Sequence, residues 1–199
     1  MSDTIVKTTE KATIDCSMVV IKTREGTPKV YGFTYGTKAS IEANVETQEA
    51  IKLIVKGVLK AQRPEKRILT GHTITLTNSL LAMELLPLFN GGELVKGGTG
   101  GTEIVGYNGP ATGEEVVKTK FDLTLYSEIL EGSSVVGYEE VIYPNCEGQP
   151  FGLNSEDDVF RISDITIVSA PGKDAEGQPE RAMKMSIVEE LPTITGGAA

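Results

Sequence analysis

The chain has 199 residues, 39% of them hydrophobic, and a formal net charge of −9, which together indicate one globular domain spanning residues 1–199. The negative charge argues against a protein that holds nucleic acid or an anionic membrane by charge, and no apolar run is long enough for a transmembrane helix. The N-terminal residues lack an apolar signal region, so Cys16 and Cys146 are expected to be reduced thiols in a cytosol; a disulfide between them stays open.

β-Branched and aromatic residues dominate the first half of the chain and predict strands. The predicted strands cover residues 16–23, 29–36, 38–47 and 67–77, with a turn at 24–28.

Residues 50–62 are ambiguous. Their three lysines recur every four residues, as on a helix face, whereas the apolar residues 51, 53 and 55 alternate, as in a strand. Because Gly57 weakens a helix by roughly 1 kcal/mol, we predict one long strand here, followed by a turn at 63–66.

Two of the predicted strands have a polar face and an apolar face, because side chains alternate along a strand. On 38–47 the apolar side is Ile41, Ala43 and Val45, and the polar side is Glu42, Asn44 and Glu46. On 67–77 the apolar side is Ile74 and Leu76, and the polar side is Thr73, Thr75 and Thr77.

One helix is predicted over 79–89, with Asn78 as its N-cap and Gly91 and Gly92 ending it. Its wide apolar stripe predicts tight packing on a sheet, and Pro87 is expected to bend or shorten the last turn. The core-facing residues are Leu81, Leu85, Leu88 and Phe89.

The second half begins with the glycine-rich segment 90–119, predicted to be a long loop or a hairpin; such segments often serve binding or assembly. Strands are predicted at 120–129, 134–143, 158–170 and 181–191, and a loose tail at 193–199. The apolar phase within 158–170 changes near Ser163, which predicts a bulge there.

No pattern in the sequence predicts catalysis, a metal or a cofactor. His72 is the one histidine, and a lone histidine within a strand is typically structural. The glycines at 97–101 lack the lysine of a phosphate-binding loop, and the acids at 154–158 lack calcium-loop spacing. We therefore expect no enzyme and no cofactor.

Charge is unevenly distributed along the chain. From Lys52 to Arg67 there are six basic residues and one acid, whereas from Glu139 to Glu180 there are ten acids and two bases. These segments are either two solvated surfaces or the two halves of a head-to-tail contact between copies. The candidate interface residues are Lys52, Lys56, Lys60, Arg63 and Lys66, facing Glu156, Asp157 and Asp158.

A linked set of segments resembles the major tail proteins, or tail tube proteins, of tailed bacteriophages. The resemblance covers roughly residues 37–192 and is closer to the long non-contractile type than to the contractile type. The segments are VETQEAIKLIVKGVLKAQRPE, TGHTITLTNSLLAMELLPLFNGG, VIYPNCEGQPFGL, DDVFRISDITIVSAP and RAMKMSIVEELP.

This resemblance implies a mainly β fold: a β-sandwich with one packed α-helix. Its inner sheet would join those of other subunits in a β-barrel around a lumen, as hexameric rings that stack into a tube for DNA. The implied partners are further copies of the chain, the tape measure, tail terminator and initiator or baseplate proteins, and transient DNA, with no membrane. The implied location is the virion tail, assembled in the bacterial cytoplasm. Segment 90–119 is the candidate for contacts between subunits or rings.

The resemblance also gives the polar strand faces a role. A basic wall would hold the closely spaced phosphates of DNA, whereas a wall of carboxylates, amides and hydroxyls would let DNA slide. The expected lumen residues are Glu42, Asn44, Glu46, Thr73, Thr75 and Thr77. In the alternative interpretation these residues face bulk solvent, and the lysines of 50–62 are expected outside the lumen.

Other functions stay open. The chain could be the tube subunit of a contractile phage-like injection particle. It could also be a monomeric β-sandwich binding module with an aromatic platform of Tyr31, Phe33 and Tyr35, although these residues would fit a core equally well. An enzyme on a similar fold is disfavoured by the shortage of histidines and of metal-ligand spacing.

Overall fold

Antiparallel strands account for most of the molecule, so the prediction of a mainly β protein is confirmed. The computed structural model describes residues 11–34, 36–78, 82–98, 100–113, 116, 119–153, 157–158, 163–173 and 176–194.

Eight strands form one sheet in the order β2-β1-β9-β10-β11-β6-β3, with β12 also paired to β10. They are β1 (Ala12–Thr23), β2 (Val30–Phe33), β3 (Gly36–Gln48), β6 (Lys66–Asn78), β9 (Phe121–Glu131), β10 (Ser134–Gly148), β11 (Ser163–Ser169) and β12 (Lys184–Val188). Two separate hairpins are β4 (Ile51–Val55) with β5 (Val58–Arg63), and β7 (Glu93–Gly97) with β8 (Glu103–Asn108).

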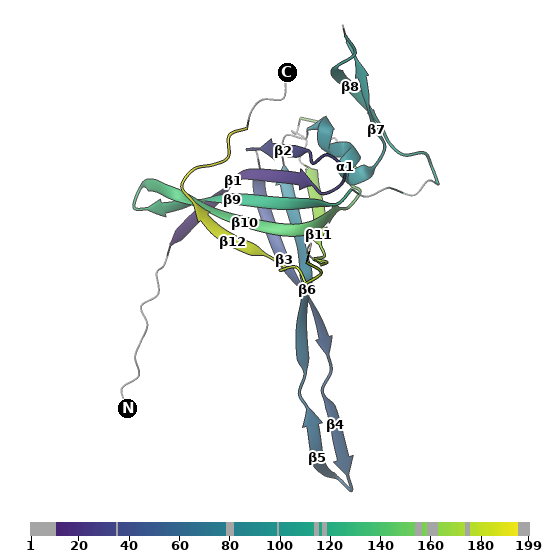
Figure 1. Ribbon diagram of the computed structural model, residues 1–199, viewed down its shortest axis with the longest axis vertical. Helices are drawn as coiled ribbons and strands as arrows, with labels where there is room; N and C mark the ends of the chain where they lie inside the picture. The colour runs from purple at the N-terminus through teal and green to yellow at the C-terminus, as the bar shows by residue number, and fades with distance from the viewer. Residues whose placement is uncertain are drawn as a thin grey trace.

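The long strand β10 gives the sheet its shape. Its first half pairs with β12 and its last residues pair with β11. Between them the register shifts at Pro144 and Asn145, and Asn145 has a positive φ of 50°, which asparagine tolerates better than most residues. As a result β3, β6 and β11 run across β1, β9, β10 and β12 (Figure 1).

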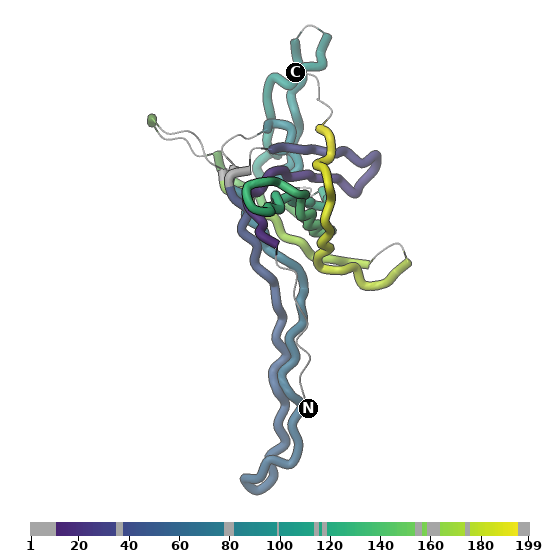
Figure 2. Tube along the Cα trace, turned by 90° about the vertical axis from the view of Figure 1, so that its left-hand side faces the viewer, coloured from purple at the N-terminus to yellow at the C-terminus, as the bar shows by residue number. Residues whose placement is uncertain are grey.

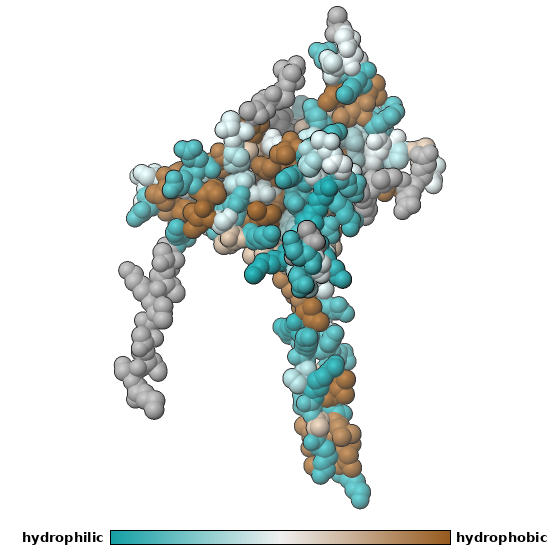
Figure 3. Space-filling model, in the orientation of Figure 1, coloured by the Kyte–Doolittle hydropathy of each residue, from teal (hydrophilic) through white to brown (hydrophobic). Residues whose placement is uncertain are grey.

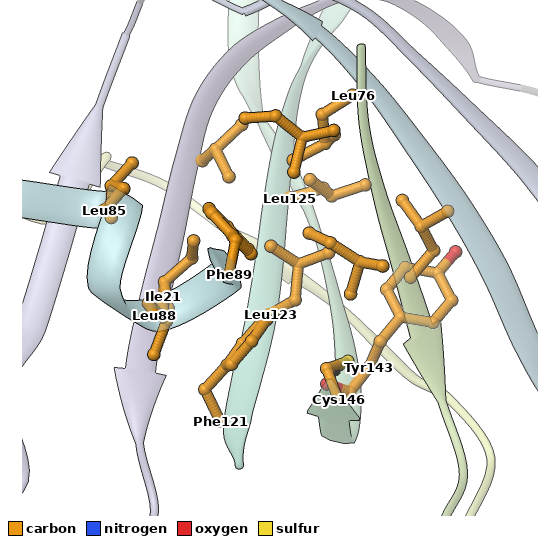
Figure 4. Close-up of a cluster of buried hydrophobic side chains, with 14 residues drawn as sticks. Ile21, Leu76, Leu85, Leu88, Phe89, Phe121, Leu123, Leu125, Tyr143 and Cys146 are labelled. Carbon is orange, nitrogen blue, oxygen red and sulfur yellow. Dashed lines mark hydrogen bonds between the residues drawn. The ribbon is translucent and has the colours of Figure 1, made fainter. Parts of the chain in front are cut away.

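The core lies between these two groups of strands. Ile74 and Ile167 come from one group, and Ile21 and Leu123 come from the other; all four are fully buried. Phe89 fills the open side, with its ring edge-to-face against Phe121 at 5.9 Å between centroids (Figure 4).

The helix differs from the prediction. Residues 79–81, including Leu81, lie outside the described residues, Asn78 ends β6, and the described helical segment consists of a 3-10 turn η1 (Met83–Leu85) and α1 (Leu86–Asn90). Pro87 stands in the first turn of α1, where its missing N–H costs nothing, and not in a bent last turn. The predicted core contacts are confirmed for Leu85, Leu88 and Phe89, which are buried.

The prediction of one strand over 50–62 was wrong. The chain reverses at Lys56 and Gly57, so that β4 and β5 form a hairpin. The predicted turn at 63–66 is also wrong, because β5 and β6 run almost straight on through Pro64 and Glu65. Residues 36–78 thus form one long two-stranded ribbon, whose far part, including β4 and β5, projects from the body (Figure 2).

Three further predictions have outcomes here. Segment 90–119 contains the β7–β8 hairpin, so the hairpin alternative was right for its described part. The register of β11 with β6 has no shift from Ser163 onward, so the described strand carries no bulge. Cys16 and Cys146 are free thiols in this chain, as expected.

We predict that Leu85→Ala lowers the free energy of unfolding by about 2–5 kcal/mol, because it leaves a cavity beside a side chain that is 2% exposed. Met83→Ala in the same 3-10 turn is the control, since Met83 is 50% exposed and its loss should change stability by no more than about 0.5 kcal/mol. Urea unfolding measures both, and equal effects would contradict the packing of this segment.

Burial raises the pKa of the Cys146 thiol to about 12, above its value in the unfolded chain. The neutral thiol therefore stabilises the fold fully below the unfolded pKa of about 8.5, and this contribution is lost as the pH rises toward the folded value. We predict that the unfolding free energy of Cys146→Ala falls less between pH 8 and pH 10.5 than that of the wild-type chain. Parallel pH dependences would refute this.

Candidate functional site

Three neighbouring strands place their polar residues on one surface. In the pairing of β3 with β6, Glu42 lies opposite Thr73, and in the pairing of β6 with β11, Thr77 lies opposite Asp164. Residues directly opposite each other in a sheet share a face. We call this surface the polar face; it comprises Ser40, Glu42, Asn44, Thr73, Thr75, Thr77, Asp164 and Thr166.

The reverse side of the same strands is apolar and faces the core. Ile41, Ile74 and Ile167 lie side by side across the three strands, and Ala39, Leu76 and Ile165 form the next row. The alternation seen in the sequence thus separates a dry side from a wet side.

Hydrogen bonds join side chains across the polar face. The Thr73 hydroxyl donates to Asn44 Oδ1 at 3.1 Å, and the Thr77 hydroxyl donates to Asp164 Oδ1 at 2.6 Å. Glu42 and Asp164 are exposed and give the face a negative charge. By alternation Lys38 belongs to the same side and offsets part of this charge.

Glu46 stands apart from the others. A register shift after Asn44 leaves Thr70 with no residue opposite it in β3. Glu46 lies opposite Ile68, at the point where the projection begins. The structure therefore brings five of the six expected lumen residues together and leaves Glu46 at the margin.

Sequence reasoning missed Ser40, Asp164 and Thr166. A signal was present, because residues 164, 166 and 168 alternate with buried isoleucines in β11. The pairing of β11 with β6 cannot be read from either strand alone, and this pairing places Asp164 and Thr166 beside the threonines of β6.

The second feature is the hairpin arm, defined as β4, β5 and their turn, residues 51–63. Every residue of the arm is exposed, including six large aliphatic side chains at 44–61%. They are Ile51, Leu53, Ile54, Val55, Val58 and Leu59. Figure 3 shows these apolar residues gathered toward the end of the projection.

The turn at the tip of the arm has an identifiable geometry. Lys56 and Gly57 both have positive φ, 48° and 76°, as a two-residue type I′ turn requires. Gly57 suits this conformation and a lysine does not, so the arm carries some backbone strain at Lys56.

The expected basic and acidic interface residues do not meet within one chain. Lys52, Lys56, Lys60 and Arg63 are exposed on the arm, and Lys66 begins β6 at its base. Asp157 and Asp158 lie in an exposed turn of the body, and Glu156 is outside the described residues. Among the described residues no ion pair joins the two groups; Arg67 instead binds Glu65 at 2.8 Å.

His72 lies on the core side of β6, 7% exposed, with its ring edge-to-face against Tyr143 at 5.2 Å between centroids. Within the described ranges, no group of three His, Cys, Asp or Glu side chains is arranged to hold a metal. In the same part of the chain, no helix has the length and apolarity needed to cross a membrane.

The aromatic platform considered for a binding module is not assembled. Tyr31 and Phe33 are partly buried and pack against the core, and Tyr35 lies outside the described residues.

Comparison with known proteins does not assign this chain to a family. Neither a scan against protein-family models nor a search of curated proteins finds a match to this chain. A functional proposal therefore depends on the polar face, on the arm and on the resemblance carried by the sequence segments above.

We predict that Lys56→Asn stabilises the arm and Gly57→Ala destabilises it, each by roughly 1 kcal/mol, because asparagine accepts a positive φ and alanine does not. Hydrogen exchange of the full chain should show slower exchange of β4 and β5 amides in the first variant and faster exchange in the second. Unchanged rates in both would rule out the turn geometry described.

Proposed function

We propose that this chain is the structural subunit of a phage-type tail tube, with hexameric rings stacked into a conduit for DNA. In this proposal the two crossed groups of strands form a β-sandwich with α1 packed at its side. The single observation that carries the proposal is that one chain combines a wet, weakly acidic sheet face with an apolar arm that its own body does not cover.

The free edge of the sheet supports ring formation. Among the described strands β3 pairs only with β6, so its outer edge presents unpaired backbone groups along a long strand. Such edges readily pair with another chain. Joining β3 to the sheet of a neighbouring copy would continue the polar face from subunit to subunit around a bore.

The chemistry of the polar face suits a bore that carries DNA. DNA presents one negative charge per about 1.7 Å of helix axis, so a cationic wall would bind it and slow its passage. Threonine hydroxyls satisfied by Asn44 and Asp164 offer no cation to phosphates. On the same side Lys38 is outnumbered by Glu42 and Asp164, and Val168 is apolar. The lysines of the arm lie beyond this face, on the projecting ribbon (Figure 1).

The β7–β8 hairpin is a second projection, and we assign it to contacts between subunits or rings. The other proposed partners are the tape measure, tail terminator and initiator or baseplate proteins, in a virion tail. A tube of a contractile injection particle would use the same features and is the alternative. A monomeric binding module has less support, because Tyr31 and Phe33 pack against the core.

Electron microscopy of the purified chain over a range of concentrations tests the proposal. Hollow tubes or six-fold rings are the expected result. A chain that stays monomeric at the highest concentrations, even with tail initiator proteins, would refute it.

A charge reversal tests the bore. We predict that tubes of Glu42→Lys with Glu46→Lys still form but retain double-stranded DNA, because they offer cations to phosphates, and that added salt releases it. Glu131→Lys with Glu189→Lys, both exposed and outside the polar face, is the control with the same change in net charge. The measurement is co-sedimentation of tubes with DNA, and equal retention by both variants would place residues 42 and 46 outside the bore.

A further inference from the structure

A groove of about 390 Å³ opens between β3 and β12. Each of these strands has one edge that is unpaired in the described chain. Ala39 and Ile41 line it from β3, and Leu125 and Val141 line it from β9 and β10. Met185 of β12 and Met183, just before that strand, complete the apolar lining. Ile41 is 41% exposed and Met185 is 60% exposed. The groove is thus the uncovered end of the core, where side chains point inward but nothing in the described chain closes over them.

One face of the hairpin arm is apolar and is not covered by the described chain, whereas the opposite face mixes Ile54 and Leu59 with Lys52 and Gln62. By the pairing of β4 with β5, Leu53 lies opposite Ala61, and Val55 lies opposite Val58. Alternation places Ile51 on the same side. A two-stranded hairpin is at best marginally stable in water unless a face is packed, so this surface needs a partner.

We propose that the apolar face of the arm docks in the β3–β12 groove of a second copy of this chain, an inference that rests on the proposed self-assembling function. Figures 1 and 2 show the arm extending away from its own body. The contact is heterologous, with arm on one side and groove on the other, and such contacts repeat into rings or filaments.

Charge favours this pairing. The arm carries lysines and Arg63 with no acid, and the groove is lined by Asp15 and Glu139 against one base, Lys38. The larger cleft beside α1 is a poorer match, because its acids Glu25 and Glu84 are balanced by Lys29 and Lys96 and leave it without net charge. Opposite charges around an apolar contact fix register and exclude wrong partners.

Backbone pairing adds to the contact. Within the described chain β12 pairs with β10 only, so its other edge is open at the rim of the groove. An arm strand entering there could extend the sheet while its aliphatic side chains fill the groove.

The native thiol of Cys16 can report on this docking, because it lines the groove. β1 bulges after Ile14, where Asp15 has a φ of 57°, and the bulge leaves Cys16 lining the groove. The other thiol, Cys146, is fully buried. A cysteine placed on the arm can therefore be bridged to Cys16 of another copy without further mutation.

The test uses the full chain carrying Leu53→Cys and a short bismaleimide at pH 8, with long reaction times because burial raises the pKa of the Cys16 thiol. We expect covalent dimers and higher ladders on denaturing gels, lost when Cys16→Ser is added. Gln62→Cys, exposed on the opposite face of the arm, is the matched control and should give several-fold less product.

Each outcome decides the inference. Equal product from both arm positions, or assemblies that form without any link to Cys16, would overturn the docking while leaving the tube intact. Linked copies without rings or tubes would support the docking and refute the tube. A chain that stays monomeric, or whose arm instead carries it onto phosphatidylglycerol vesicles without cross-linking, would overturn the docking and identify the arm as a membrane element or an unpaired projection.

Discussion

The proposed assembly depends on one interaction, the burial of the aliphatic residues of the hairpin arm, which are exposed in the single chain. Ordering each residue of such a ribbon costs about 1–2 kcal/mol in backbone entropy. Burying a side chain such as Leu53 or Val55 returns roughly 1.5–3 kcal/mol, but both are about half exposed in the isolated chain. In the proposed assembly the arm would therefore gain its stability from a neighbouring copy.

The remainder of the chain serves to hold this arm and a two-sided layer in fixed positions. Strict alternation in β3 and β6 puts isoleucines toward the core and threonines, Glu42 and Asn44 toward water, and a one-residue slip would exchange the two sides. The core contacts of Phe89 and the bend of β10 at Asn145 set where the two groups of strands cross. The arm continues directly from β3 and β6, so any partner that covers it is held at a set position relative to the polar face.

Much of this could be predicted from alternation alone, and the exceptions have physical causes. The two faces of 38–47 and of 67–77 were clear because period two is a local property. The hairpin within 50–62 was missed because Lys56-Gly57 is an unusual pair for a type I′ turn, and the flanking residues are apolar on both sides of it. The helix was predicted to run through Ala82 because Asn78 fits an N-cap, whereas Ala82 is extended and pairing with β11 holds Asn78 in a strand. Asp164 and Thr166 join the polar face only because β11 pairs with β6. This pairing joins residues far apart in sequence, so local patterns cannot predict it.

Hydrogen exchange of the arm in the dilute monomer and in the concentrated assembly tests the central claim most directly. Amides of residues 51–63 should exchange rapidly in the monomer, because only two strands and no core protect them, and should become strongly protected on assembly. Amides in β9 and β6 should be protected in both states and serve as the internal reference. An arm already protected in the monomer, or still exchanging rapidly in the assembly, would contradict the account.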